Sequence, residues 1–386
     1  MRSIQGSSSL HSPIRPLHAL SPNAHRGRVS RGSGLRVHPI QPRRELDARP
    51  RARRPGCGHG PEPDDPAVRR PPRARLRELL AAESGCTADQ VLLTPGAAGA
   101  LFVISTSLLS AGDHLVVLRP NYATNIETPR AIGCDISYVE LSLENGFRYT
   151  AADIAAAMTP QTRLVSITNP HNPTGTVIEE DEVAQIAALV SERGGYLLVD
   201  ETYRDLTVAR PRPFATTLSE NVISVASLSK AYGLPGLRVG WLMARDRALN
   251  ELFLAAKEQM VICGPVLDEE IAYRVYRRRT EELPQIAREV RRGVEALASW
   301  MATEPAMEWV RPSGGVVAFP RIRADAGIDV PRFYETLNGT HGTFVGPGHW
   351  FEQDDRFMRI GFGWPSAAEL EGGLYSISAS LAAARI

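Results

Sequence analysis

The sequence contains almost no lysine. Of its 44 basic residues only Lys230 and Lys257 are lysines, and the other 42 are arginines. A coding bias toward arginine, such as a GC-rich genome produces, replaces lysine wherever only a positive charge is needed. It cannot replace lysine where an amine must lose its proton and attack a carbonyl, because arginine stays protonated. The scarcity therefore marks a lysine kept for its chemistry. Lys257 matches no motif and is expected to be only a surface charge.

Long apolar runs and clustered cysteines are also missing. No apolar stretch approaches the roughly 18 residues that a membrane-spanning helix needs, so we expect no membrane partner. The four cysteines are scattered without a Cys-x-x-Cys pair. This excludes a disulfide framework and a zinc site, and it indicates reduced thiols in a cytoplasmic protein. With 43% hydrophobic and 23% charged residues, the 386-residue chain has a globular composition and enough length for two domains.

The first 75 residues lack tyrosine and any regular apolar period. They hold 16 arginines against 5 acidic residues, a balance of +11, together with 12 of the 29 prolines. We therefore expect this segment to be disordered. Three interpretations fit it: a nucleic-acid-binding tail, an organelle presequence, or a non-native, mis-assigned N-terminus. We favour the last and do not expect nucleic acid to be a partner; native peptides from before Arg75 would contradict this preference.

From Leu76 onward, short apolar runs alternate with helical patterns. A helix is expected from Leu76 to about Gly85, and another over 181–192. Strands that alternate with helices predict a largely parallel sheet covered on both faces. The strand candidates are 91–93, 115–118, 136–141, 164–168, 196–199, 222–226 and 239–243.

A long helical pattern over about 283–301 leads to a second region. There, 316–319 and 358–362 read as strands of a smaller α+β unit. We therefore expect a large domain at 76–280 and a small domain at 281–386.

Small and polar residues follow several strand candidates, which is where ligands bind in parallel sheets. Gly96, Ala97 and Ala98 follow the first one, and their small side chains let the N–H groups of a helix N-terminus close on a phosphate. Asn172 lies in the run NPHNPTG, where two prolines hold its amide in place. Asp200 ends an apolar strand, and a carboxylate there is costly unless it has a partner such as a protonated ring nitrogen.

Lys230 follows the sixth strand candidate. Ser227 precedes it by three residues and Arg238 follows it by eight. Both can reach a phosphate, the arginine through its planar fork. An arbitrary lysine is most often a solvated surface residue, but these neighbours favour a Schiff-base lysine beside a phosphate site.

Together and in this order, these motifs resemble those of the fold-type I pyridoxal-phosphate enzymes of the class I/II aminotransferase family, the aspartate aminotransferase superfamily. The resemblance runs from about Leu76 to the C-terminus. It implies an α/β fold with a mostly parallel seven-stranded central sheet covered by helices, and a smaller C-terminal α+β domain. It also implies pyridoxal 5'-phosphate as cofactor, an amino acid and a 2-oxo acid as substrates, and a homodimer with active sites at the subunit interface.

The resemblance implies a role for each candidate residue. Lys230 would form the Schiff base, an internal aldimine, and then shuttle a proton between the substrate α-carbon and the cofactor. Asp200 would pair with the pyridine nitrogen. Arg359, in the run MRIGF, would bind the substrate α-carboxylate. The other implied contacts are the phenolic oxygen with Asn172 and Tyr203, the ring face with Tyr122, and the phosphate with Gly96, Ala97, Ala98, Ser227 and Arg238.

The N-terminus departs from this family. Members have an ordered arm there, with a glycine-containing segment that closes over the substrate and a tyrosine that reaches the neighbouring subunit's phosphate. Residues 1–75 contain no tyrosine and nothing that aligns with this arm. The departure puts in question the activity of the chain as written, and not the chemistry of its core.

Transamination is the leading functional interpretation. The same scaffold supports elimination, decarboxylation and cyclisation of basic amino acids. The segment 121–129 and the NPHNPTG run also resemble capreomycidine-synthase-like enzymes of natural-product pathways. A regulator with a folded DNA-binding N-terminus is disfavoured by the prolines there. Asn125, His349 and Trp350 are candidates either for a substrate side-chain pocket or for packing.

Overall fold

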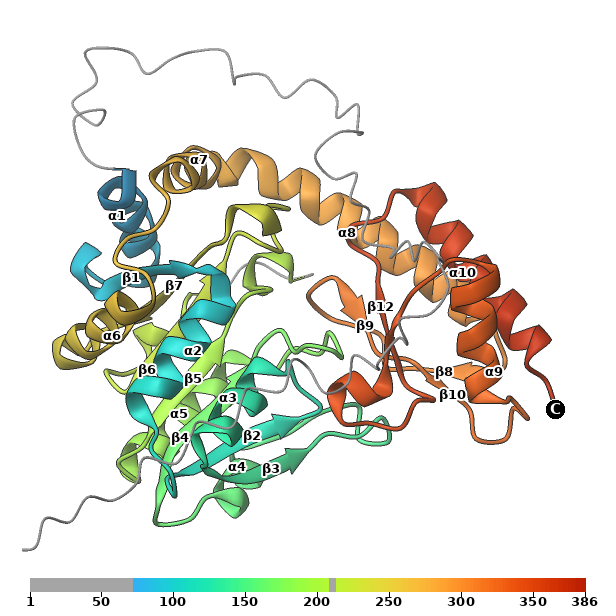
Figure 1. Ribbon diagram of the computed structural model, residues 1–386, viewed down its shortest axis with the longest axis horizontal. Coiled ribbons are helices and arrows are strands. Elements are labelled where there is room, and N and C mark those ends of the chain that lie inside the picture. Colours follow the sequence, from blue (N-terminus) through green and yellow to red (C-terminus); the bar gives the residue numbers. More distant parts are fainter. Residues whose placement is uncertain (1–71, 208–212) are drawn as a thin grey trace, which may run out of the picture.

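The computed structural model describes residues 72–207 and 213–386, and a seven-stranded sheet forms the centre of this part of the chain (Figure 1). The strand order is β1-β7-β6-β5-β4-β2-β3. β7 is antiparallel to β1 and β6, and the remaining pairs of this sheet are parallel. The predicted mostly parallel sheet is confirmed, and each strand candidate overlaps one strand: β1 (Val91–Pro95), β2 (His114–Arg119), β3 (Asp135–Glu140), β4 (Thr162–Thr168), β5 (Tyr196–Asp200), β6 (Val222–Ser227) and β7 (Val239–Ala244).

Helices cover both faces of the sheet, because alternate strand residues are apolar on each face. Leu198 belongs to the core under α2, α3 and α6, whereas Val199 belongs to the core under α4 and α5. Successive residues at the end of β5 therefore point to opposite sides of the sheet. The helices of the first side are α2 (Gly96–Leu108), α3 (Thr124–Ile132) and α6 (Arg247–Met260); those of the second are α4 (Ala151–Ala157) and α5 (Glu180–Glu192).

The helix expected from Leu76 begins earlier, as α1 (Pro72–Ser84), and packs beside α7 (Val266–Arg277). Proline suits the first position of a helix because the N–H it lacks would have no partner there. Of the segment 1–75 that we expect to be disordered, residues 1–71 lie outside the described residues. Its last four positions, 72–75, are helical.

A long helix, α8 (Arg279–Met301), leads into the C-terminal region, residues 302–386 (Figure 1). Both predicted strands of this region are present in shorter form, as β9 (Val317–Ala318) and β12 (Met358–Gly361), and β11 (Gly346–Pro347) completes a three-stranded sheet. The other strands and α-helices here are β8 (Met307–Glu308), β10 (Arg321–Ile322), α9 (Val330–Glu335) and α10 (Ala367–Ala383). Across residues 72–207 and 213–386, no helix has the length and apolarity to cross a membrane.

The expectation that Lys257 is a surface charge is wrong. Lys257 is only 9% exposed, and it lies on the face of α6 that also buries Leu249 and Phe253. These positions are four and eight residues apart, so they form one stripe along the helix. The long aliphatic stem of a lysine packs on apolar surface while its amine stays near the rim. No sequence motif marks the burial of a lysine of this kind.

Candidate active site

The N-terminus of α2 forms one side of a small cradle at the edge of the sheet. Gly96 begins this helix with φ +75°, a left-handed conformation that favours glycine. The first turn has no acidic residue, and no side chain caps it. The positive end of the helix dipole is therefore not neutralised, which makes this end suited to an anion.

Arg238 lies across the same helix end. Its Nη2 donates to the carbonyl oxygen of Pro95 at 3.3 Å. A Cβ atom on Gly96 would lie 2.6 Å from that nitrogen, so a side chain here would push the guanidinium out of this position. The cradle thus combines a helix N-terminus with a fixed positive charge.

Strand pairing brings Ser227 to this cradle. Ser227 pairs with Gly240 across β6 and β7, and a Cβ atom on Gly240 would lie 2.6 Å from the backbone nitrogen of Ala97. The expected phosphate residues Gly96, Ala97, Ser227 and Arg238 are therefore neighbours, with Ala98 next in the first turn of α2.

Lys230 lies in the turn that follows β6, three residues beyond Ser227. Its side chain is half-buried, and its carbonyl oxygen accepts from the N–H of Gly233 at 3.2 Å. Tyr232, also in this turn, is buried and donates its hydroxyl to Asp205 at 2.8 Å. These bonds fix the backbone that carries the lysine.

Asp200 ends β5 with a carboxylate that is 5% exposed. Its Oδ1 accepts from the N–H of Thr202 at 3.0 Å and from the hydroxyl of Thr202 at 2.6 Å. Burial raises the pKa of Asp200, and the hydrogen bonds from Thr202 and Asn125 oppose this rise. Both partners are neutral, so the carboxylate is suited to a further, cationic partner.

A buried polar network lies behind Asp200, and the sequence patterns did not reveal it. Asn125, one of its members, accepts from the Ser166 hydroxyl at 3.1 Å, and its Nδ2 lies 3.4 Å from Oδ1 of Asn121. Oδ1 of Asn121 also accepts from the Thr168 hydroxyl at 3.1 Å. Nδ2 of Asn121 is buried with no hydrogen-bond partner in the part of the chain that the structure describes. Asn125 therefore helps to hold Asp200. The only sign of this role in the sequence was the four-residue spacing of Asn121 and Asn125.

Tyr203 is buried close to Asp200. Burial raises the pKa of Tyr203 to about 12; the positive charge of Arg359 opposes the rise, and Asp200 and Tyr122 add to it. The phenol therefore keeps its proton at neutral pH and can donate a hydrogen bond. Tyr122 itself is 37% exposed, which leaves its ring accessible to a stacking partner.

Arg359, on β12, joins the C-terminal region to the loop after β4. Its Nη1 donates to Oδ1 of Asn172 at 3.0 Å, and its guanidinium lies 4.9 Å from the ring centre of Phe351. His349, in contrast, is engaged with Asp355 at 2.6 Å, and Trp350 is partly exposed beside it. Arg359 thus contacts Asn172, and the charges of Arg359 and Asp200 both act on Tyr203, so these four residues form one group.

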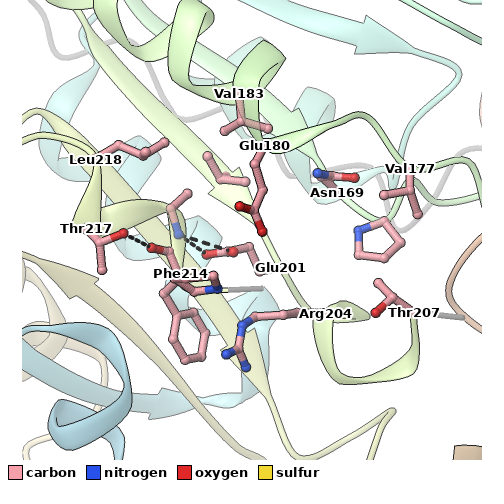
Figure 2. Close-up of a pocket in the computed structure, with 14 residues that line it drawn as sticks. Asn169, Val177, Glu180, Val183, Glu201, Arg204, Thr207, Phe214, Thr217 and Leu218 are labelled. Carbon is pink, nitrogen blue, oxygen red and sulfur yellow. Dashed lines mark hydrogen bonds between the residues drawn. The ribbon is translucent and has the colours of Figure 1, made fainter. Parts of the chain in front are cut away.

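A separate cavity of about 100 Å³ lies on the other side of β5 (Figure 2). Val199 and Glu201 line it, on the face opposite Asp200. The carboxylate of Glu201 accepts from the N–H of Ala215 at 3.2 and 3.1 Å. No candidate site residue from the sequence is among the described residues that line this cavity, so the cavity is separate from the cradle of Gly96 and Arg238.

The sheet and the cradle define a fold-type I pyridoxal-phosphate enzyme. A model of the family "Aminotransferase class I and II" matches residues 71–377, and the chain belongs to this family. The resemblance found in the sequence is therefore confirmed, and so is the cofactor that it implies.

Three relatives place the chain within the family. It is 34% identical to the capreomycidine synthase of Streptomyces vinaceus, over 80% of this chain and 78% of that protein. It is 28% identical to the arginine–pyruvate transaminase AruH of Pseudomonas aeruginosa, over 72% of each chain. The solved structure of the PLP-dependent cyclase OrfR is similar with a TM-score of 0.72 and 30% identity, covering 80% of this chain and 82% of that one.

The residues present fit pyridoxal phosphate. The uncapped end of α2 and the guanidinium of Arg238 complement a phosphate dianion. The buried carboxylate of Asp200, with neutral partners, complements a protonated ring nitrogen. Nδ2 of Asn121 is buried without a hydrogen-bond partner among the described residues, so it can donate to a further polar group.

Proposed function

We propose that the enzyme transfers an amino group from an α-amino acid to a 2-oxo acid. The observation that carries the proposal is the 3.0 Å bond between Arg359 and Asn172, because it holds a guanidinium that would bind a carboxylate within electrostatic reach of Tyr203. A charge-assisted pair between this guanidinium and a substrate carboxylate contributes about 1.5–3 kcal/mol. Such a site selects molecules with an α-carboxylate.

In this proposal Lys230 has two successive tasks, and each of the other side chains has one. When bound, pyridoxal phosphate supplies an electron sink for the electron pair released at the substrate α-carbon. The amine of Lys230 would hold the cofactor and then carry the proton of that carbon. Asp200, oriented by Thr202, would keep the ring nitrogen protonated. Tyr203 and Asn172 would donate to the phenolic oxygen.

The remaining residues would bind the phosphate and the ring face of the cofactor. The phosphate would be held by the N–H groups of Gly96, Ala97 and Ala98, together with Ser227 and Arg238. Tyr122 would stack on the exposed face of the ring, which contributes about 0.5–1.5 kcal/mol beyond the burial of area.

A panel of L-amino acids tests the proposal. Each amino acid is mixed with the holoenzyme in the absence of an oxo acid, and the conversion of the bound cofactor to its amine form is followed together with release of the 2-oxo acid. We expect at least one amino acid to give both products in equal amounts. If none does so, transamination is the wrong reaction.

Cyclisation of a basic amino acid is the second candidate. The 34% identity to a capreomycidine synthase and the likeness to the cyclase OrfR favour it. In this case the amino acid would keep its nitrogen, so no 2-oxo acid would be released. Mass and NMR spectra of the product distinguish the two reactions, because a cyclised amino acid would displace transamination.

We further propose that the protein works as a homodimer in the cytoplasm. Large apolar side chains are exposed from the connection between α6 and α7 into the first turn of α7, with Ile262 at 81% and Leu267 at 77%. Water-exposed apolar side chains gathered in one segment support an interface with a second copy. The free thiols of Cys86, Cys134 and Cys263 support a reducing compartment.

A further inference from the structure

A glutamate of the C-terminal region pairs with two arginines at the edge of the central sheet. Oε1 of Glu352 lies 2.6 Å from Nη2 of Arg130 on α3, and its Oε2 lies 3.5 Å from Nη1 of Arg119 at the end of β2. The Glu352 side chain is 21% exposed. A single exposed ion pair contributes little, but two arginines that converge on one partly buried carboxylate form a network.

Other groups already order both arginines. The guanidinium of Arg119 stacks on the ring of Tyr138 at 4.1 Å and bonds to Glu140. Arg130 donates to the hydroxyl of Tyr138 at 3.0 Å. Because these side chains have lost much of their freedom, pairing with Glu352 costs little further conformational entropy.

The backbone of Glu352 has a conformation that glycine adopts more readily. Glu352 follows the short helix η7 (Gly348–Phe351) with φ +57°, in the left-handed region that strains residues with a side chain. The turn is tight, because a Cβ atom on Gly348 would clash with the carbonyl oxygen of Asp354. The N–H of Gln353 closes it on the carbonyl oxygen of Gly348 at 3.0 Å. A glutamate at this position is consistent with a task for its carboxylate.

The same turn carries the aromatic support of Arg359. Phe351, next to Glu352, is buried, and its ring centre lies 4.9 Å from the Arg359 guanidinium. Phe351 also packs edge-on against Phe319 at 5.4 Å. Ahead of the turn, Gly346 pairs with Arg359 across β11 and β12. Movement of the turn would therefore move the ring beneath this guanidinium.

We propose that Glu352 is a positioning residue for substrate binding. By tying its turn to Arg119 and Arg130, it holds Phe351 under Arg359 and so fixes the guanidinium where the substrate carboxylate binds. The inference rests on the proposed role of Arg359. Removing the carboxylate charge would loosen Arg359 equally toward the substrate and the transition state, which raises KM and leaves kcat nearly unchanged.

The test compares Glu352→Gln with Glu144→Gln in the holoenzyme. Glu144 pairs with Arg321 at 2.9 Å, a second ion pair between the residues around the central sheet and the C-terminal region, so this variant is a matched control. The probe is the amino acid with the lowest KM in the panel. We expect Glu352→Gln to raise this KM about fivefold with kcat within about twofold, and Glu144→Gln to change neither.

Two further measurements complete the test. Hydrogen exchange should quicken over residues 346–361 in Glu352→Gln only. Arg130→Gln should add little to the KM of Glu352→Gln, because Glu352→Gln already removes the ion pair between Glu352 and Arg130. An unchanged KM in Glu352→Gln, or an equal rise in Glu144→Gln, overturns the inference. Arg359→Gln separates the two proposals: if it leaves KM unchanged, the carboxylate role of Arg359 fails and the inference fails with it. If Arg359→Gln alone raises KM, only the role of Glu352 is wrong.

Discussion

At the scale of the residue, Asp200 and Glu201 are consecutive in the sequence, yet their carboxylates lie on opposite sides of β5. Asp200 faces the polar network of Asn125, while Glu201 faces the cavity beside Ala215 (Figure 2). The sequence predicted Asp200 because an acid that ends an apolar strand needs a partner. The burial of Glu201 comes from a segment more than ten residues later, so no local pattern indicates it.

The pH dependence of stability follows from Glu201. Burial raises its pKa to about 7 from the ordinary 4.5; bonds from Ser224 and Ala215 and the charge of Arg204 oppose the rise, and Asp200 adds to it. Between these pH values the folded protein keeps a proton that the unfolded chain has released. Glu201 therefore lowers the free energy of unfolding as pH rises from about 4.5 to 7, and its own contribution to this fall is about 3 kcal/mol.

Glu201→Gln should remove this dependence. Urea unfolding of both proteins from pH 4 to pH 8 measures it, and the variant should gain stability relative to the parent as pH rises through this window. A difference between the two proteins that stays constant with pH would show that Glu201 titrates normally.

At the scale of the element, the N-terminus of α2 depends on Gly96, because a side chain there would lie in the way of Arg238. Gly96→Ala places a Cβ atom 2.6 Å from the guanidinium and strains a backbone with φ +75°. We expect the dissociation constant of pyridoxal phosphate to rise about tenfold or more. Fluorescence titration of the apoenzyme measures it.

Gly236→Ala is the matched control for this prediction. Gly236 lies in the neighbouring short helix η5 (Pro235–Leu237), and a Cβ atom there meets nothing within 4 Å. Its affinity for the cofactor should stay within about twofold of the parent. Equal effects of the two substitutions would mean that the cradle is not the phosphate site.

At the scale of the whole molecule, the strands and their order along the chain could be predicted from the sequence, but the contacts between distant residues could not. Apolar runs indicated all seven strands of the sheet, and the residues after them indicated Asp200, Asn172 and Lys230. The burial of Lys257 and the pairing of Glu352 with Arg130 depend on contacts between distant parts of the chain. Such contacts leave no period or spacing in a single sequence.

The proposed dimer gives a prediction at this scale. Ile262→Asp, in the connection between α6 and α7, and Leu267→Asp, in the first turn of α7, each place a charge on this exposed apolar surface. The dimer dissociation constant should therefore rise about 100-fold. Tyr375→Asp, at a residue 72% exposed on α10, is the control. Sedimentation velocity over a range of concentrations measures all three. A monomeric parent protein, or a dimer that both substitutions leave intact, would refute this interface.

The two lysines allow the most direct test of the central claim, that the amine of Lys230 carries the cofactor. The protein is incubated with pyridoxal phosphate, reduced with borohydride and digested, and its peptides are weighed by mass spectrometry. We predict the reduced cofactor on Lys230 in nearly every molecule and none on Lys257, which is only 9% exposed on α6. Label on Lys257, or no label on either lysine, would contradict the account.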